Sequence, residues 1–175
     1  DADKLDEMFT RHTKERKEAM AADIDGTGYL FQMFRYELAN HEYSYTGDAE
    51  ETLDALGLTY GDVNSSPAMR AALNAAIKVV CNDVAAAVIK RLIGKVVIHR
   101  LDAYSTNSIY LKFDYGIVNS LRISDHEGKK HLSYRYNILL NQQVREVRHM
   151  NGYDRIFYPP SMLDRCCDEI LAAKE

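Results

Sequence analysis

The string Asp23-Ile24-Asp25-Gly26-Thr27 is the first place where residue types and spacing could do chemistry. In aspartate-nucleophile phosphatases the same pattern follows a buried strand, and its first aspartate attacks phosphorus. Here the preceding residues, KERKEAMAA, have the composition of an exposed helix. The string also fits the start of a calcium-binding loop, but Phe34 stands where that loop requires a bidentate glutamate. We therefore interpret the string as a turn that breaks a helix.

The histidines and cysteines lack the spacing of a metal site or a disulfide framework. The six histidines show neither HxxxH nor HxH spacing, and Cys81, Cys166 and Cys167 form no CxxC, so we expect buried, reduced thiols. Asp125 and His126 are adjacent, and adjacent side chains on an extended chain point to opposite sides. No GxSxG or phosphate-binding loop is present. We expect a non-enzyme without cofactor or metal; a nuclease using Asp125 or His126 is the enzymatic alternative.

Charge is segregated along the chain, which bears on partners more than on fold. Residues 1–89 carry 8 Lys and Arg against 16 Asp and Glu, residues 90–150 carry 11 against 5, and residues 151–175 carry 3 against 5. The 34 residues from Tyr36 to Met69 contain no Lys or Arg. This stretch is either a solvated face or a surface complementary to a basic groove. The predicted partner-binding residues are Glu42, Asp48, Glu50, Glu51, Asp54 and Asp62.

The same acidic stretch contains DALGLTYGDV, which resembles the turn of a helix-turn-helix. Phosphate contacts would be repelled there, because no basic residue is near in the sequence. Tyr36, Tyr43, Tyr45 and Tyr60 lie in or beside the stretch, and tyrosine is enriched at protein interfaces. The composition therefore favours a protein partner over DNA for this segment.

A basic segment between Val118 and Asn137 is predicted to form a hairpin. Its basic residues are interleaved with Tyr134 and Tyr136, which combines charge that attracts phosphate with surface on which bases stack. The alternative is an ordinary solvated hairpin whose tyrosines pack inward. The predicted partner-binding or nucleic-acid-binding residues are Arg122, Lys129, Lys130, His131 and Arg135.

Helices and strands must position these residues, and sequence periodicity predicts them. Apolar residues recur at helical spacing in five segments, which are residues 3–22, 29–40, 49–56, 67–92 and 161–174. Gly57 is placed to end the third helix in a left-handed conformation, with Leu58 against Leu53 in a Schellman turn. Ser66 and Pro67 form a cap and first-turn pair at the start of the fourth helix.

Beyond Gly94 the apolar period changes to two, and about four strands are predicted in 96–101, 109–114, 121–123 and 132–138. An antiparallel meander is expected because the connections are too short for helical crossovers. Asn151-Gly152 is suited to turn one more hairpin between Val144 and Tyr158.

The predicted fold class is α+β, with a helical acidic part (1–93), a basic antiparallel sheet of about four strands (94–158) and a C-terminal helix (159–175). A length of 175 residues favours a single domain. No apolar run approaches a membrane span, and the first residues are too charged for a signal peptide. We therefore expect a cytoplasmic protein without membrane contact.

Two segments, YELANHEYSYTGDAEETLDALGL and YLKFDYGIVNSLRISDHEGKKHLSYRYN, resemble small proteins from phages and mobile elements of gut Firmicutes. They make up under a third of the chain, but in size and layout the whole chain resembles a type II-A anti-CRISPR family that inhibits Cas9. The resemblance implies a protein that binds the Cas9–guide RNA complex and blocks target-DNA binding or cleavage. The charge pattern is compatible with this, because Cas9 holds nucleic acid in a basic channel.

Two other expectations stay open beside this resemblance. A nucleic-acid-binding accessory protein of a phage or mobile element would act through the basic hairpin alone. A homodimer is compatible with exposed tyrosines and a free sheet edge.

Overall fold

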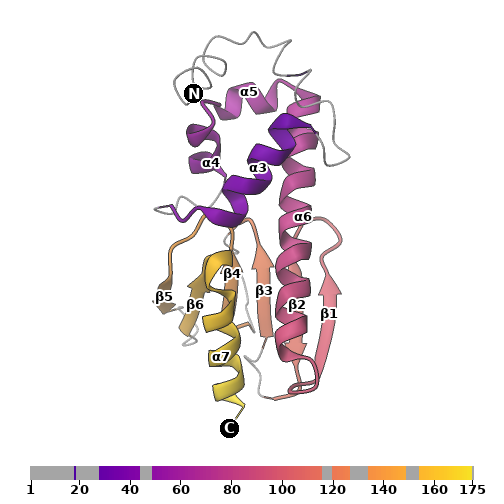
Figure 1. Cartoon of the computed structure of the whole chain (residues 1–175), viewed down its shortest axis with the longest axis vertical. Coiled ribbons are helices and arrows are strands. Elements are labelled where there is room, and N and C mark those ends of the chain that lie inside the picture. Colours follow the sequence, from indigo (N-terminus) through magenta and orange to yellow (C-terminus); the bar gives the residue numbers. More distant parts are fainter. Residues whose placement is uncertain are drawn as a thin grey trace. The chain divides into compact units, whose positions relative to one another are not determined.

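The structure is a computed structural model, and it describes residues 18, 28–43, 49–115, 120–126, 134–148 and 154–174. The fold is α+β, with helices in the N-terminal half, a mixed sheet of six strands and a C-terminal helix (Figure 1). The predicted fold class is therefore confirmed. The helix expected over residues 3–22 lies outside the described residues, apart from Glu18.

The chain divides into two compact units. Unit 1 consists of Asp1–His41 and Ala49–Val80, and unit 2 of Glu42–Asp48 and Cys81–Glu175. The expectation of a single domain stays a prediction.

Helices make up the described part of unit 1. They are α3 (Tyr29–Asn40), α4 (Glu50–Ala55), α5 (Tyr60–Asn64) and the first part of α6 (Pro67–Leu92). Three of them match the predicted segments, whereas α5 was not predicted. Most large apolar side chains of these helices and their connections are buried, and this removes them from water and stabilises the unit. The large apolar residues in the core of unit 1 include Leu30, Phe31, Phe34, Leu38, Leu53, Leu56, Leu58, Val63, Met69, Leu73 and Ile77.

Local hydrogen bonds set the C-terminal end of α4 and the start of α6. Gly57 has φ +71°, and the N–H of Leu58 donates to the Leu53 carbonyl at 2.9 Å, which confirms the predicted Schellman turn. The Ser66 hydroxyl accepts from the N–H of Met69 at 3.2 Å, which confirms the predicted N-cap.

Helix α6 is, by length and composition alone, a candidate membrane span in the part of the chain that the structure describes. The sequence-based statement that no apolar run approaches this length therefore needs correction. Exposed polar residues, among them Arg70, Lys78 and Lys90, interrupt the apolar ones along the helix. Its buried residues recur every three or four positions, as in the core helix of a folded domain. They are Met69, Ala72, Leu73, Ala76, Ile77, Val80, Cys81, Val84, Ala85, Val88 and Leu92.

The sheet of unit 2 contains strands of both directions. Its strands are β1 (Ile98–Asp102), β2 (Ile109–Phe113), β3 (Ser120–Ser124), β4 (Tyr136–Leu139), β5 (Arg145–Arg148) and β6 (Asp154–Tyr158), in the order β1-β2-β3-β4-β6-β5. The β1-β2, β2-β3 and β5-β6 pairs are antiparallel, whereas β3-β4 and β4-β6 are parallel. The predicted pairing of the segments around Val144 and Tyr158 is confirmed, while the Asn151-Gly152 turn lies outside the described residues.

The hairpin predicted between Val118 and Asn137 is wrong, as is the antiparallel meander, because β3 and β4 run parallel. Residues 125–135 separate the two strands, and a chain of that length can span the sheet from one end of a strand to the other. Every residue of β3 and β4 is buried, as expected for parallel strands covered on both faces. The meander was predicted because the connections were judged too short for a helical crossover, and the parallel pairing of β3 and β4 shows that connection length did not settle strand direction.

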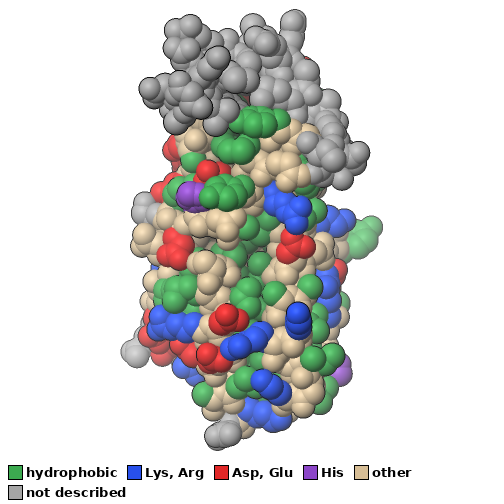
Figure 2. All heavy atoms as spheres, in the orientation of Figure 1, with side chains coloured by type: hydrophobic (Ala, Val, Ile, Leu, Met, Phe, Trp, Pro, Cys, Tyr) green, Lys and Arg blue, Asp and Glu red, His purple; other side chains and the backbone are tan. Residues whose placement is uncertain are grey.

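Helix α7 (Leu163–Ala173), preceded by the 3₁₀ turn η1 (Pro160–Met162), packs on the sheet beside the C-terminal part of α6 (Figure 1). The Tyr115 hydroxyl donates to the Ile170 carbonyl at 2.8 Å, and Tyr158 donates to Glu169. Arg91 of α6 pairs with Asp168 of α7 at 2.6 Å. Figure 2 shows acidic and basic side chains interspersed over these helices, so this face carries no large field of one sign.

Candidate functional site

Helices α4 and α5 present the acidic residues of unit 1. We call Glu50, Glu51, Asp54 and Asp62 the acidic surface. Glu50 and Asp54 are exposed, and their spacing of four residues places them on the same side of α4. Thr52 and Leu53 of the same helix are buried in the core. Burial of the apolar side therefore directs these two carboxylates toward solvent.

Some of these carboxylates also stabilise helix ends. Asp62 accepts a hydrogen bond from the N–H of Thr59 at 3.0 Å, and the Thr59 hydroxyl accepts from the N–H of Asp62 at 3.1 Å. This reciprocal capping box starts α5. Glu50 and Glu51 occupy the first turn of α4, where negative charge is favoured by the helix dipole. Asp54 lies outside that first turn, so the helix dipole does not explain its position.

The remaining predicted acidic residues do not join this surface. Glu42 belongs to unit 2, where it is exposed and accepts a hydrogen bond from the Ser161 hydroxyl at 2.8 Å. Asp48 lies outside the described residues. The acidic stretch of sequence is thus divided between the two units. Exposed tyrosines of unit 1, Tyr36 on α3 and Tyr60 on α5, add aromatic surface.

Arg122 is not on a solvated surface, and its predicted place on an exposed basic hairpin is wrong. Its side chain lies on β3 and is only 3% exposed. The guanidinium Nη2 donates to the Ser124 hydroxyl at 3.2 Å, and its carbon lies 5.6 Å from the centre of the Tyr134 ring. A guanidinium above an aromatic ring is a favourable cation–π arrangement. Arg122 therefore contributes to the interior of unit 2.

The other predicted basic residues give little support for a nucleic-acid surface. Arg135 is half-buried, and its guanidinium carbon lies 5.8 Å from the centre of the Tyr136 ring. Tyr134 and Tyr136 are themselves buried, so neither ring is available to stack on a base. Lys129, Lys130 and His131 lie outside the described residues.

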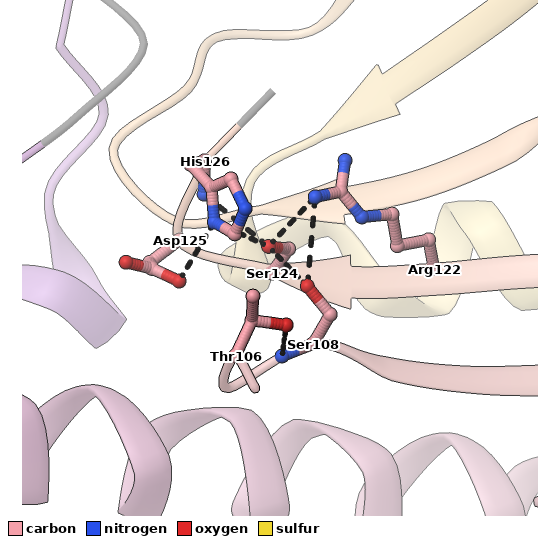
Figure 3. Close-up of polar contacts among 6 residues, drawn as sticks. All are labelled: Thr106, Ser108, Arg122, Ser124, Asp125 and His126. Atoms are coloured by element: carbon pink, nitrogen blue, oxygen red, sulfur yellow. Dashed lines mark hydrogen bonds and ion pairs between the residues drawn. The ribbon is translucent and has the colours of Figure 1, made fainter. Parts of the chain in front are cut away.

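A polar cluster lies at the end of β3, and we call it the Ser124 cluster (Figure 3). The Ser124 and Ser108 hydroxyl oxygens are 2.9 Å apart, and the N–H of His126 donates to the Ser124 hydroxyl at 3.3 Å. Arg122 Nη2 points at both hydroxyls in the close-up. The cluster thus joins the end of β3 to the start of β2 and surrounds a buried positive charge with hydroxyl dipoles.

The sequence predicted that the side chains of Asp125 and His126 point to opposite sides of an extended chain. This prediction is wrong. The chain bends after Ser124, and His126 Nδ1 lies 3.2 Å from both the Asp125 carboxylate and the Ser124 hydroxyl. In a hydrolytic triad the acid holds one ring nitrogen while the nucleophile bonds the other. One nitrogen cannot fill both roles, and Ser124 is only 1% exposed. The geometry therefore gives no support for nucleophilic catalysis by these residues.

The three cysteines are free and buried, and their burial matches the prediction. Burial raises the pKa of the Cys81 thiol to about 12, and the nearby Asp125 charge adds to the shift. Burial likewise raises the pKa of Cys166 and of Cys167. Because the thiolate is the reactive form, these side chains are poor nucleophiles at neutral pH. Among the described residues, no group of three or more His, Cys, Asp or Glu could hold a metal ion.

Comparison with known proteins gives one similarity. Residues 1–79, less than half of the chain, match a family of unknown function, DUF7659. No curated protein and no solved structure matches the chain. The matched segment includes the acidic surface but ends before the first strand of the sheet.

Proposed function

We propose that this protein acts by binding, and that the acidic surface of unit 1 contacts a basic surface on a macromolecular partner. The observation that carries the proposal is the exposure of Glu50 and Asp54 on one side of α4, within 34 residues that contain no Lys or Arg. The net negative charge of this stretch favours a negative potential around it. Such a potential steers association with a basic partner and raises the association rate.

The Cas9–guide RNA complex is the partner that the family resemblance suggests. Cas9 binds nucleic acid in a positively charged channel, which an acidic protein surface complements. The proposed outcome is inhibition of target-DNA binding or cleavage in the cytoplasm of a bacterial cell. The support consists of charge complementarity together with the two resembling segments.

A nucleic-acid-binding accessory protein is the less supported alternative. Its proposed contacts relied on Arg122 and on stacking by Tyr134 and Tyr136, all of which are buried. A nuclease relied on Asp125 and His126, whose shared contact at one ring nitrogen does not form a relay. Binding through carboxylates therefore has the stronger physical basis.

The test is a double charge reversal, Glu50→Lys with Asp54→Lys, assayed for pull-down of a panel of Cas9–guide RNA complexes and for inhibition of DNA cleavage. We expect binding to weaken by about tenfold or more, because two attractive contacts become repulsive. The control is Asp114→Lys with Glu146→Lys, two exposed residues of unit 2. This control changes the net charge equally and should leave binding within about threefold of the unchanged chain.

Two outcomes would contradict the proposal in different ways. Equal binding by both double variants would remove the acidic surface from the mechanism. Failure of the unchanged chain to bind or inhibit any Cas9 of the panel would reject the partner. A parallel shift assay with free RNA and DNA tests the accessory-protein alternative, which requires steeply salt-dependent binding without Cas9.

A further inference from the structure

Strand β1 is an exposed outer strand of the six-stranded sheet (Figure 1). It pairs with β2 on one side, and residues 99–102 are exposed. No other strand pairs with it in the part of the chain that the structure describes. An outer strand presents unpaired backbone groups and is a template for pairing with another chain.

The backbone groups that face outward can be identified from the register. The N–H of Ala103 donates to the Ser108 carbonyl at 2.9 Å, so residue 103 bonds toward β2. In an antiparallel pair this direction alternates, so residues 99 and 101 also bond toward β2. The N–H and C=O groups of Ile98, Arg100 and Asp102 therefore point away from the sheet.

The side chains near this edge are unusually apolar for a solvated strand. Leu101 on β1 is 59% exposed, and Val97 and Ile93 just before it are 55% and 69% exposed. Tyr104, just after the strand, is fully exposed. An unpaired outer strand that carries exposed apolar side chains is prone to pair with another strand.

The charges of β1 define which partner strand fits. Arg100 and Asp102 lie on the same side of the strand, and Arg100 Nε is 2.7 Å from Asp102 Oδ1. If a second copy pairs antiparallel with its Leu101 opposite Leu101, each Arg100 lies opposite Asp102 of the second copy. Opposite charges facing each other across antiparallel strands are stabilising. In the same register, the outward N–H and C=O groups of residue 100 in one copy can form hydrogen bonds with those of residue 102 in the second copy.

The neighbouring register is unfavourable. Pairing about Arg100 would place the two Arg100 side chains directly opposite each other, and Leu101 would face His99 of the second copy. Like charges directly opposite are destabilising. The sequence Arg100-Leu101-Asp102 is therefore complementary to itself in one register.

We propose that β1 is a homodimer interface in which the β1 strands of two copies pair antiparallel about Leu101. The two sheets then form one continuous sheet across the two-fold axis. A second copy is the occupant that this charge order selects, since a different protein would have to supply its own matched acidic and basic residues. The interface is short, so the dimer is weak. This inference does not rest on the acidic surface.

Charge swapping tests the register by analytical ultracentrifugation of the full chain from micromolar to millimolar concentration. The single variants Arg100→Asp and Asp102→Arg should each raise the dissociation constant at least about tenfold, which corresponds to about 1.4 kcal/mol. The double variant Arg100→Asp with Asp102→Arg restores opposite charges and should dimerise within about threefold of the unchanged chain. Asp102→Arg keeps the Arg100 contact with Asn82, so it separates dimerisation from fold stability.

Cysteine cross-linking tests the geometry directly. In this register the two residues 101 form a non-hydrogen-bonded pair with Cα atoms about 4.5 Å apart, which suits a disulfide. Leu101→Cys should therefore form an intermolecular disulfide under mild oxidation. His99→Cys is the matched control, because the two residues 99 would be about 14 Å apart. The native cysteines are buried and should not interfere.

Three results would overturn the proposal. The first is a chain that stays monomeric at millimolar concentration. The second is dimerisation that the single charge reversals leave unchanged, or a disulfide formed by His99→Cys as readily as by Leu101→Cys. The third is growth beyond a dimer, because pairing about a two-fold axis closes after two copies.

Discussion

Gly94 offers a test of how α6 ends, because the effect of one methyl group can be worked out from the structure. Gly94 has φ +79°, in the left-handed region. A Cβ built at this position would meet nothing within 4 Å, so Gly94→Ala changes backbone energy without a clash. The left-handed conformation costs an L-residue about 1–2 kcal/mol. Alanine also restricts the unfolded chain, which returns about 0.4–1 kcal/mol. The expected net loss of stability is about 1 kcal/mol.

Gly61 provides the matched control within an α-helix. It is an exposed residue of α5, and a Cβ there would lie 3.5 Å from the Thr59 hydroxyl, which is ordinary van der Waals contact. Gly61 is not among the positive-φ glycines, Gly57 and Gly94. The same Gly→Ala change should therefore stabilise the protein, by about 0.5 kcal/mol, through helix propensity and reduced freedom of the unfolded chain.

The assay is urea unfolding of both variants beside the unchanged chain, followed by far-UV circular dichroism and repeated as thermal melts. Gly94→Ala should lower the midpoint and Gly61→Ala should raise it, and 1 kcal/mol corresponds to about 2–4 °C for a chain of this size. The reasoning would be refuted if Gly94→Ala were as stable as the unchanged chain. It would also fail if both substitutions shifted stability in the same direction.

The remaining predictions concern a cap and the buried thiols. Thr59→Ala removes one half of the capping box at α5 and should cost about 1 kcal/mol, measured by urea unfolding; Thr59→Ser, which keeps the hydroxyl, should cost much less. Burial raises the pKa of Cys81 from 9.0 to about 12. As the pH rises, the Cys81 thiol therefore loses its proton at a lower pH in the unfolded chain than in the folded protein. The contribution of the protonated thiol to folding stability is complete below pH 9 and is lost as the pH rises toward 12. A pH series of unfolding midpoints checks this, and Cys81→Ala should reduce the loss between these two values; an equal loss in that variant would contradict the assignment.

Local patterns in the sequence were sufficient for most of the helices. The capping role of Ser66 and the left-handed turn at Gly57 involve residues within five positions of each other. The sequence contained a signal for helix α5 that the prediction did not use. Thr59 and Asp62 have capping-box spacing just before Val63. A short helix with one buried apolar residue has too little periodicity to stand out otherwise.

The candidate sites depended more on tertiary structure than the helices did. Exposure of Glu50 and Asp54 follows from helical spacing beside the buried Leu53, and could be anticipated. The burial of Arg122 could not be anticipated from the sequence. Tyr134, whose ring packs against the guanidinium, lies twelve residues away along the chain. The contact between Asp125 and His126 depends on a bend after β3 that no residue type in that segment requires.

By itself, the sequence determined the α+β class, the buried thiols and the helix ends, because each depends on residue types or on hydrogen bonds between near neighbours. Only the tertiary structure decided that β3 and β4 run parallel and that Arg122 lies inside. Strand direction is set by which distant segments bury each face of the sheet, and alternation within one strand does not contain that information. It was likewise the strand order that left β1 at the edge, with Arg100, Leu101 and Asp102 exposed.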